Sequence, residues 1–253
     1  MYNARPLSVD EAPRLYQILN ELSRRAEIRN LPQIYYVPSQ LMNAFAVGTR
    51  DNAAIALTDG LLRNFNRTEL IGILAHEISH VRNNDMKVMA VADVISRVTT
   101  IFSQVGIMLL FLNFPLLALG KAAISWFAVF LLIFAPTLSS LLQLALSRTR
   151  EFNADIGAAV ISGDPKGLAQ ALQKLEYYKC SMFERILMPG HKIPDPSLLR
   201  SHPKTEERVR RLLSLTEQKD RLLTADRDTI DIAPPGISHI KSSPRWRISG
   251  LWY

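Results

Sequence analysis

Two long segments without a charged residue constrain the fold of this 253-residue chain more than any other feature. They cover residues 98–120 and 122–147 and are separated only by Lys121. Each is longer than the roughly 20 residues that an α-helix needs to cross a hydrocarbon core of about 30 Å. A soluble chain of this size rarely buries two such helices on all sides. We therefore expect a helical hairpin in a membrane, with a buried hairpin in a soluble core as the alternative.

The short connection at Lys121 predicts that both outer ends of the hairpin lie on the same side of the membrane. A positive bias marks the cytoplasmic side. The basic residues that flank the outer ends are Lys87, Arg97, Arg148 and Arg150. We therefore expect a multi-pass protein of the inner or plasma membrane whose soluble parts face the cytoplasm. Pro115 and Pro136 predict kinks and leave a re-entrant hairpin open as an alternative.

The stretch His76-Glu77-Ile78-Ser79-His80 lies in a predicted helix that runs from Thr68, a candidate cap, to about Arg97. Residues four apart share one helix face, so both histidines can point a ring nitrogen at one metal ion. Glu77 lies about 100° round the helix from His76, where it can take a proton from a bound water. This spacing is typical of zinc metalloproteases. A chance match on an ordinary helix is the alternative interpretation.

A catalytic zinc ion needs a third protein ligand and one open position for water. Glu151 and Asp155 follow the second uncharged segment and share one helix face. Glu151 is our candidate for the third ligand, and Asp155 for a hydrogen bond to the far side of a ligand histidine. Their apolar neighbours argue against a solvated helix face. Asn83 and Asp85 also follow the histidines, and the sequence leaves open whether they support the site or face solvent.

Four motifs in this order resemble the HtpX branch of the M48 membrane metallopeptidases, over most of residues 8–215. They lie at residues 43–48, 76–85, 147–155 and 201–208. The resemblance implies one zinc ion per subunit, bound by His76, His80 and Glu151, with Glu77 as the catalytic base. It also implies a zincin-like metalloprotease domain, mainly α with a small β-sheet (α+β), which the transmembrane hairpin interrupts.

The pattern divides the chain into four parts. Residues 1–97 hold the N-terminal part of the protease domain, and residues 98–147 the hairpin. Residues 148–224 hold the C-terminal part, and residues 225–253 form a tail. Members of the HtpX branch usually carry two transmembrane helices ahead of the protease domain, whereas this chain begins with a predicted soluble helix, so we expect two spans.

Short strands are predicted at residues 33–38, 43–49 and 53–58. The second has small residues that leave room for another backbone, so it can bind a substrate peptide as an added strand. The candidate substrate-binding residues are Asn43, Ala44, Phe45 and Ala46. An ordinary half-buried strand is the alternative.

Two residues near the end of the resemblance are further candidates for the site. His202 stands in the Ser-His-Pro motif and could donate a hydrogen bond to the oxyanion of the reaction, although a surface histidine is the alternative. Arg208 could serve the same purpose or orient Glu151.

Composition excludes some partners. The single cysteine, Cys180, rules out an internal disulfide and fits a reducing compartment. The net charge of +7 comes from scattered residues without a nucleic-acid-binding motif, so anionic lipid headgroups explain it better than nucleic acid. The expected partners are protein or peptide substrates and the lipid bilayer.

These observations favour a membrane-bound zinc endopeptidase, and the family resemblance implies that its substrates are misfolded or damaged membrane proteins, in quality control. One alternative is a metal-containing scaffold that binds clients without cutting them, but a scaffold has no need of Glu77. The other is a prenyl-protein (CAAX-type) processing protease, which is less suited to this chain because two spans cannot build a many-helix chamber.

Overall fold

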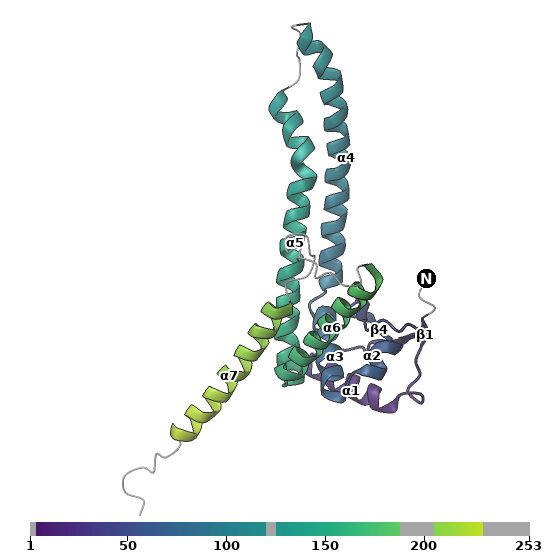
Figure 1. The fold of residues 1–253 in the computed structure, drawn as a ribbon, viewed down its shortest axis with the longest axis vertical. Helices are drawn as coiled ribbons and strands as arrows, with labels where there is room; N and C mark the ends of the chain where they lie inside the picture. Colours follow the sequence, from purple (N-terminus) through teal and green to yellow (C-terminus); the bar gives the residue numbers. More distant parts are fainter. Residues whose placement is uncertain (1–3, 120–124, 188–204, 230–253) are drawn as a thin grey trace, which may run out of the picture. The chain divides into compact units, whose positions relative to one another are not determined.

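The computed structural model describes the backbone of residues 4–119, 125–187 and 205–229. It is mainly helical with one small sheet, and two long helices extend side by side from a body that holds the other elements up to Thr216 (Figure 1). This confirms the predicted fold class. His202 and the part of the predicted tail from residue 230 onward lie outside the described residues.

The sheet has four strands in the order β1-β2-β4-β3. Their bounds are Arg5–Pro6, Gln33–Val37, Ala44–Thr49 and Asn52–Thr58 for β1 to β4. β2 and β4 are parallel, and the other two pairs are antiparallel. The three longer strands agree with the predicted ones, whereas β1 is too short to leave a sequence pattern. Among the described strands β3 pairs only with β4, so it lies at an edge of the sheet.

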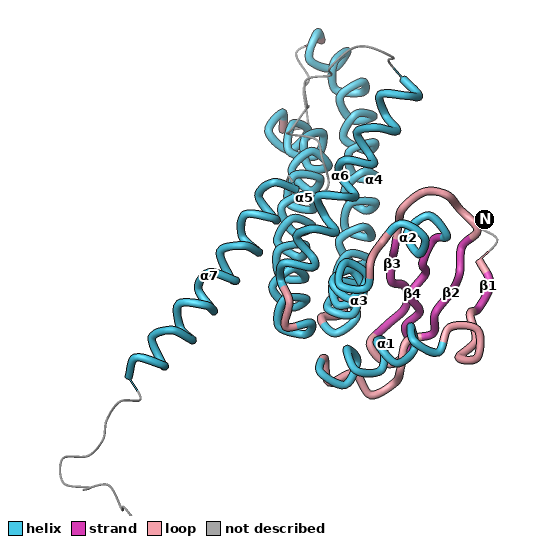
Figure 2. The backbone as a smooth tube through the Cα atoms, turned by 60° about the horizontal axis from the view of Figure 1, so that its bottom comes forward, coloured by secondary structure: helices cyan, strands magenta, loops and turns pink. Residues whose placement is uncertain are grey.

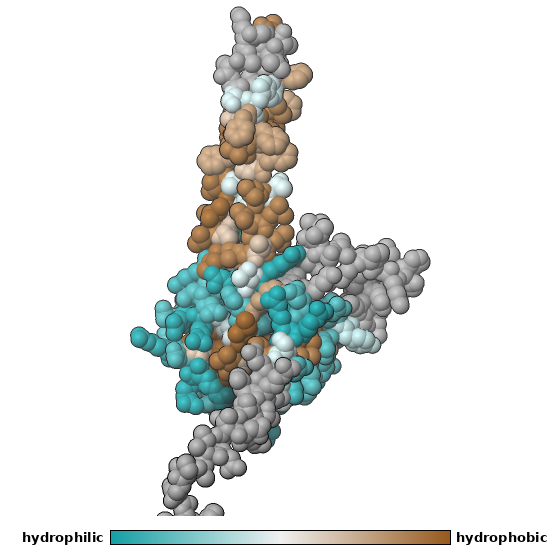
Figure 3. Space-filling model, turned by 90° about the vertical axis from the view of Figure 1, so that its left-hand side faces the viewer, coloured by the Kyte–Doolittle hydropathy of each residue, from teal (hydrophilic) through white to brown (hydrophobic). Residues whose placement is uncertain are grey.

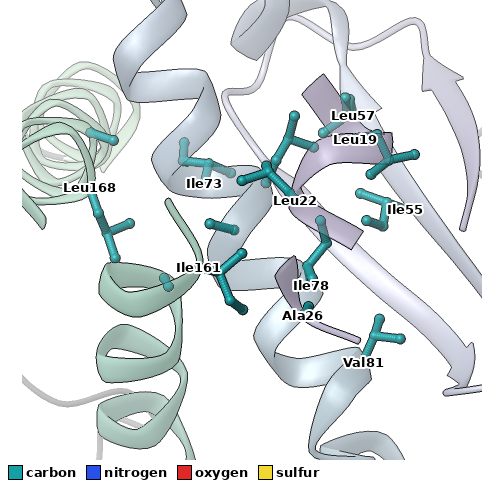
Figure 4. Packing of buried hydrophobic residues seen from close by; sticks show 14 of the residues in the cluster. Leu19, Leu22, Ala26, Ile55, Leu57, Ile73, Ile78, Val81, Ile161 and Leu168 are labelled. Carbon is teal, nitrogen blue, oxygen red and sulfur yellow. The ribbon is translucent and has the colours of Figure 1, made fainter. Parts of the chain in front are cut away.

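The core lies between the sheet and the helices. The helices of the body are α1 (Pro13–Arg25), α2 (Asp59–Asn64), α3 (Arg67–Arg82) and α6 (Pro165–Leu187). Figure 2 shows α3 next to β3, and Figure 4 shows side chains of α1, β4, α5 and α6 meeting those of α3. Because Leu74, Ala75 and Ile78 are fully buried, α3 is the central helix of the body. Such a position holds its polar side chains in fixed directions.

The start and the end of α3 both differ from the prediction. The helix is capped by Asn66, whose side chain accepts the Glu69 N–H while the Glu69 carboxylate accepts the Asn66 N–H, rather than by Thr68. The prediction of one continuous helix to Arg97 was wrong. Asn84 takes a φ of 53°, in the left-handed region that Asn tolerates better than most residues, and breaks the helix there.

The hairpin consists of α4 (Asp85–Ala118) and α5 (Trp126–Ser162). Both helices are long and apolar enough to cross a membrane. Only 11% and 6% of the residues in their apolar windows are buried inside the protein, unlike those of a core helix. Figure 3 shows the apolar surface of this hairpin above the polar body. The exposed apolar side chains therefore need a non-aqueous surrounding.

Both hairpin helices continue into the body without a break. The predicted boundaries at residues 97 and 147 fall inside α4 and α5, so each membrane helix is a direct extension of an element of the site. The boundary at residue 224 falls inside α7 (Thr205–Thr229). The four-part division stays a prediction.

Candidate metal centre

α3 presents His76 and His80 on one face, four residues apart. Their Nε2 atoms lie 3.2 Å apart, and the two rings are almost perpendicular, with an interplanar angle of 88°. Glu151 of α5 faces both rings. Its Oε2 is 3.6 Å from His76 Nε2, and its Oε1 is 3.9 Å from His80 Nε2. The three groups therefore converge from two helices, and their ligand atoms all lie within 4.8 Å of one another.

These separations fit a tetrahedral metal ion. Zinc binds His nitrogen and carboxylate oxygen at about 2.0–2.2 Å, so two of its ligand atoms lie roughly 3.3–3.6 Å apart. The two Nε2 atoms, 3.2 Å apart, lie just below that range, and each is 3.6 or 3.9 Å from a different oxygen of Glu151. One Glu151 oxygen and both Nε2 atoms lie within 4.8 Å of one another, so Glu151 must move toward the histidines to bind the same ion.

The outer nitrogen of each histidine faces a carboxylate. Asp85 Oδ2 lies 2.8 Å from His80 Nδ1, and Asp155 Oδ1 lies 3.1 Å from His76 Nδ1. The His76 contact is close but poorly directed for a hydrogen bond. An ionised carboxylate can only accept a hydrogen bond, so both carboxylates favour the tautomer with the proton on Nδ1, in which the Nε2 lone pair points inward. Two such lone pairs 3.2 Å apart call for a positive charge between them.

The pKa of His76 reflects the same preference. Burial lowers the pKa of this ring, but its close contacts with the Asp155 and Glu151 carboxylates outweigh burial and raise the pKa to about 9. The carboxylates thus favour a positive charge at this position, whether a proton or a metal ion supplies it.

The formal charges around the histidines point to a divalent ion. The acidic groups are Glu77, Glu151, Asp155 and Asp85, and the basic groups are Arg208 and Arg150. When all are ionised, the carboxylates exceed the guanidinium groups by two negative charges. A metal ion of charge +2 would neutralise this excess, whereas a single proton would not.

Arg208, from the part of α7 that belongs to the body, holds the two carboxylates of α5. Its Nε and Nη2 each donate to Asp155 over 2.7 Å, and its Nη1 lies 3.2 Å from Glu151 Oε2. The residue is only 7% exposed. A planar guanidinium that engages two carboxylates orients them, so the geometry supports the second of the two predicted roles for Arg208.

Glu77 is half-buried beside the two histidines. Burial raises the pKa of Glu77, while electrostatic interactions with His76 and His80 and a backbone hydrogen bond from Ala46 act in the opposite direction. A raised pKa suits a group that takes up and releases a proton. The contact with Ala46 also joins Glu77 to β3, the edge strand.

The predicted substrate-binding residues lie beside the metal site. β3 packs along α3, and Ala44, Phe45 and Ala46 are each partly exposed. Asn43, just before β3, is tied to β4, because its N–H donates to Thr58 Oγ1 over 2.9 Å. The structure thus brings the candidate strand, Glu77 and the candidate ligands together.

The helix break brings Asp85, and with it Arg150, to the site. Asp85 is buried against His80, whereas Asn83 caps the end of α3. Arg150, which the sequence suggested only as a membrane-flanking charge, contacts Asp85 Oδ1 through its Nη1 over 3.1 Å. The turn at Asn84 brings Asp85 back toward His80, and no spacing rule for a continuous helix predicts that contact.

Comparison with known proteins agrees with this geometry. Residues 10–216 match the family model described as Peptidase family M48. The chain belongs to this family. It is 36% identical over 232 residues to a protease HtpX homolog of Nostoc punctiforme, covering 86% of this chain and 78% of that protein. It is 37% identical over 235 residues to a protease HtpX homolog of Thermococcus sibiricus, with 85% and 78% covered.

A solved structure shares the fold. The crystal structure of S. mikatae Ste24p superposes with a TM-score of 0.53 at 23% sequence identity, covering 83% of this chain and 51% of that one. Family membership and the apolar hairpin make this chain an HtpX-like membrane metalloprotease of family M48.

Proposed function

We propose that this M48 protease is a zinc endopeptidase in which His76, His80 and Glu151 bind the ion and Glu77 is the catalytic base. The observation that carries the proposal is the convergence of three ligand atoms within 4.8 Å, next to a half-buried glutamate. Two neutral imidazoles and one carboxylate are a typical ligand set for catalytic zinc.

The residues divide the chemistry among them. A zinc ion at this site would lower the pKa of a water molecule to about 7 and polarise the scissile carbonyl. Glu77 takes the proton of that water and delivers it to the leaving amine. Arg208 and Asp155 hold Glu151 and His76 in place, as their 2.7–3.2 Å contacts suggest. His202 stays a predicted donor to the oxyanion.

The substrate peptide extends the sheet. β3 offers an unpaired backbone edge among the described strands, and Ala46 joins that edge to Glu77. A peptide added as a further strand would run past the base, and main-chain hydrogen bonds would bind it with little regard to its sequence. Such binding suits unfolded segments of many proteins.

The substrates we propose are misfolded or damaged membrane proteins, in quality control. Support comes from the hairpin, because α5 itself carries Glu151 and α4 follows α3, which carries His80, after the turn at Asn84.

We further propose that the site faces the cytoplasm, because basic residues flank both ends of the hairpin. A reporter at Lys121 should then appear outside the membrane, and reporters at Met1 and Tyr253 inside. Labelling of Lys121 from the cytoplasmic side would favour the re-entrant hairpin.

Metal analysis combined with proteolysis tests the function. Detergent-purified protein should contain about one zinc per chain and cleave an unfolded model protein, and a chelator should abolish the cleavage. The matched control is His80→Ala, which should lose both metal and activity. A metal-free protein that cleaves as fast as the loaded one would contradict the proposal. Bound metal without any cleavage would favour the scaffold.

A further inference from the structure

Asp85 occupies a position that a solvent-facing helix residue would not. It is the first residue of α4, yet it is only 4% exposed. Its Oδ2 accepts from His80 Nδ1 over 2.8 Å, and its Oδ1 accepts from Arg150 Nη1 over 3.1 Å. Both carboxylate oxygens are thus engaged, each by a different helix. A buried carboxylate requires such partners, because an unpaired one would be strongly destabilising.

The two partners of Asp85 differ in what they do. His80 is a candidate metal ligand on α3, and Arg150 directly precedes the third candidate ligand, Glu151, on α5. One side chain at the start of α4 therefore connects a ligand of α3 with the ligand-bearing turn of α5. The contact also lies where both hairpin helices enter the body.

The contacts around His80 repeat those around His76. His76, Asp155 and Arg208 form one series of contacts, and His80, Asp85 and Arg150 form a second. In each, an arginine holds an aspartate that faces the Nδ1 atom of a histidine. The first series joins α5 and α7 to α3, whereas the second joins the two hairpin helices to α3.

We propose that Asp85 and Arg150 are positioning residues of the metal centre, with Arg150 acting through Asp85. Asp85 fixes the tautomer and the ring direction of His80, and Arg150 fixes Asp85. Metal affinity then depends on contact between the bases of α4 and α5, which links the hairpin to the active site. This inference rests on the proposed metal centre.

Metal affinity tests the proposal without relying on activity. Zinc dissociation constants of the full-length, detergent-purified protein would be measured by competition with a chromophoric chelator. Asp85→Asn should weaken zinc binding by about 10–100-fold, as loss of such outer contacts does. Arg150→Gln should weaken it in the same direction but less. The double variant should bind no worse than Asp85→Asn, because the effect of Arg150 requires the Asp85 carboxylate.

The matched control is Asp93→Asn. Asp93 lies on α4 and also pairs with an arginine, Arg97, over 2.9 Å, but it is half exposed. It should leave zinc affinity unchanged. The melting temperature of each metal-free variant would be measured as well, to separate a loss of zinc affinity from a loss of folding. A merely structural role would lower the stability and leave the zinc affinity of the folded protein intact.

The possible results distinguish a failure of the metal centre from a failure of the roles proposed for Asp85 and Arg150. A wild-type chain without zinc affinity would contradict the metal centre itself. Wild-type binding together with unchanged affinity in folded Asp85→Asn would overturn only the present inference. Additive losses in the double variant would show that Arg150 acts independently. If Asp85→Asn does not fold, Arg150→Gln decides alone, and unchanged affinity there overturns the proposal.

Discussion

Gly157→Ala tests the spacing between the two helices that share the metal centre. Gly157 lies on α5, two residues after Asp155, and faces Ser79 of α3. A Cβ atom at position 157 would overlap Ser79 Oγ and lie 3.1 Å from Ser79 Cβ. Ser79 is 1% exposed, so its side chain has little room to move.

Two effects of opposite sign compete in this variant. Alanine in a helix is favoured over glycine by about 1 kcal/mol. Overpacking a close contact usually costs about 1–3 kcal/mol. The overlap involves a side chain fixed between two helices, so we expect overpacking to win and the free energy of unfolding to fall by up to about 2 kcal/mol. Zinc affinity should fall as well, since α5 carries Glu151 away from the histidines of α3.

Ser79→Ala provides the compensating change. Ser79 Oγ is buried without a hydrogen-bond partner in the described structure, so its removal alone should be neutral or slightly stabilising. In that background Gly157→Ala should lose much of its effect. Thermal unfolding in detergent would give the stability of the wild type, the two single variants and the double variant. Val160→Ala, at a 71% exposed position of α5, controls for changes in helix propensity. A Gly157→Ala protein more stable than the wild type would refute this helix spacing.

Four further substitutions test the metal site and the contacts that hold it. Glu151→Ala should remove most bound metal and Asp155→Ala should weaken binding about 10–100-fold, as metal analysis and chelator competition would show; full metal content in Glu151→Ala would place the third ligand elsewhere. Arg208→Gln should destabilise the metal-free protein by about 3–5 kcal/mol because two buried carboxylates lose their partner, and zinc should reduce the loss; an unchanged melting temperature would argue against the pairing. Asn66→Ala should lower the free energy of unfolding by about 1 kcal/mol through loss of the cap, with zinc affinity unchanged; a loss of affinity would contradict a purely structural role.

The helical period was sufficient to predict that the two candidate histidine ligands lie together. The four-residue spacing of His76 and His80 places both rings on one helix face wherever the helix lies, and the same rule places Glu151 near Asp155. Which of the two carboxylates faces the inner nitrogens depends on how α5 packs on α3. We proposed Glu151 for that part from the residues, and the family resemblance implies the same assignment.

The contacts that Asp85 makes with His80 and Arg150 could not be predicted from the helical period. The left-handed residue Asn84 turns the chain so that Asp85 meets His80, and a period of 3.6 residues cannot reveal such a break. The contact of Arg150 with Asp85 joins residues far apart in the chain, and its charge pointed equally well to lipid headgroups. The N-terminal cap of α3 was predictable from the sequence, because Asn66 and Glu69 have the spacing of a capping box. We had assigned the cap to Thr68 instead.

The role of Glu77 is the central claim, and Glu77→Gln tests it most directly. The amide keeps the size of the side chain but cannot take a proton, and the three candidate ligands remain in place. Zinc content and cleavage of an unfolded model protein would be measured on the same detergent-purified sample. Our account predicts full zinc occupancy with no proteolysis. Residual cleavage well above that of His80→Ala would contradict Glu77 as the catalytic base.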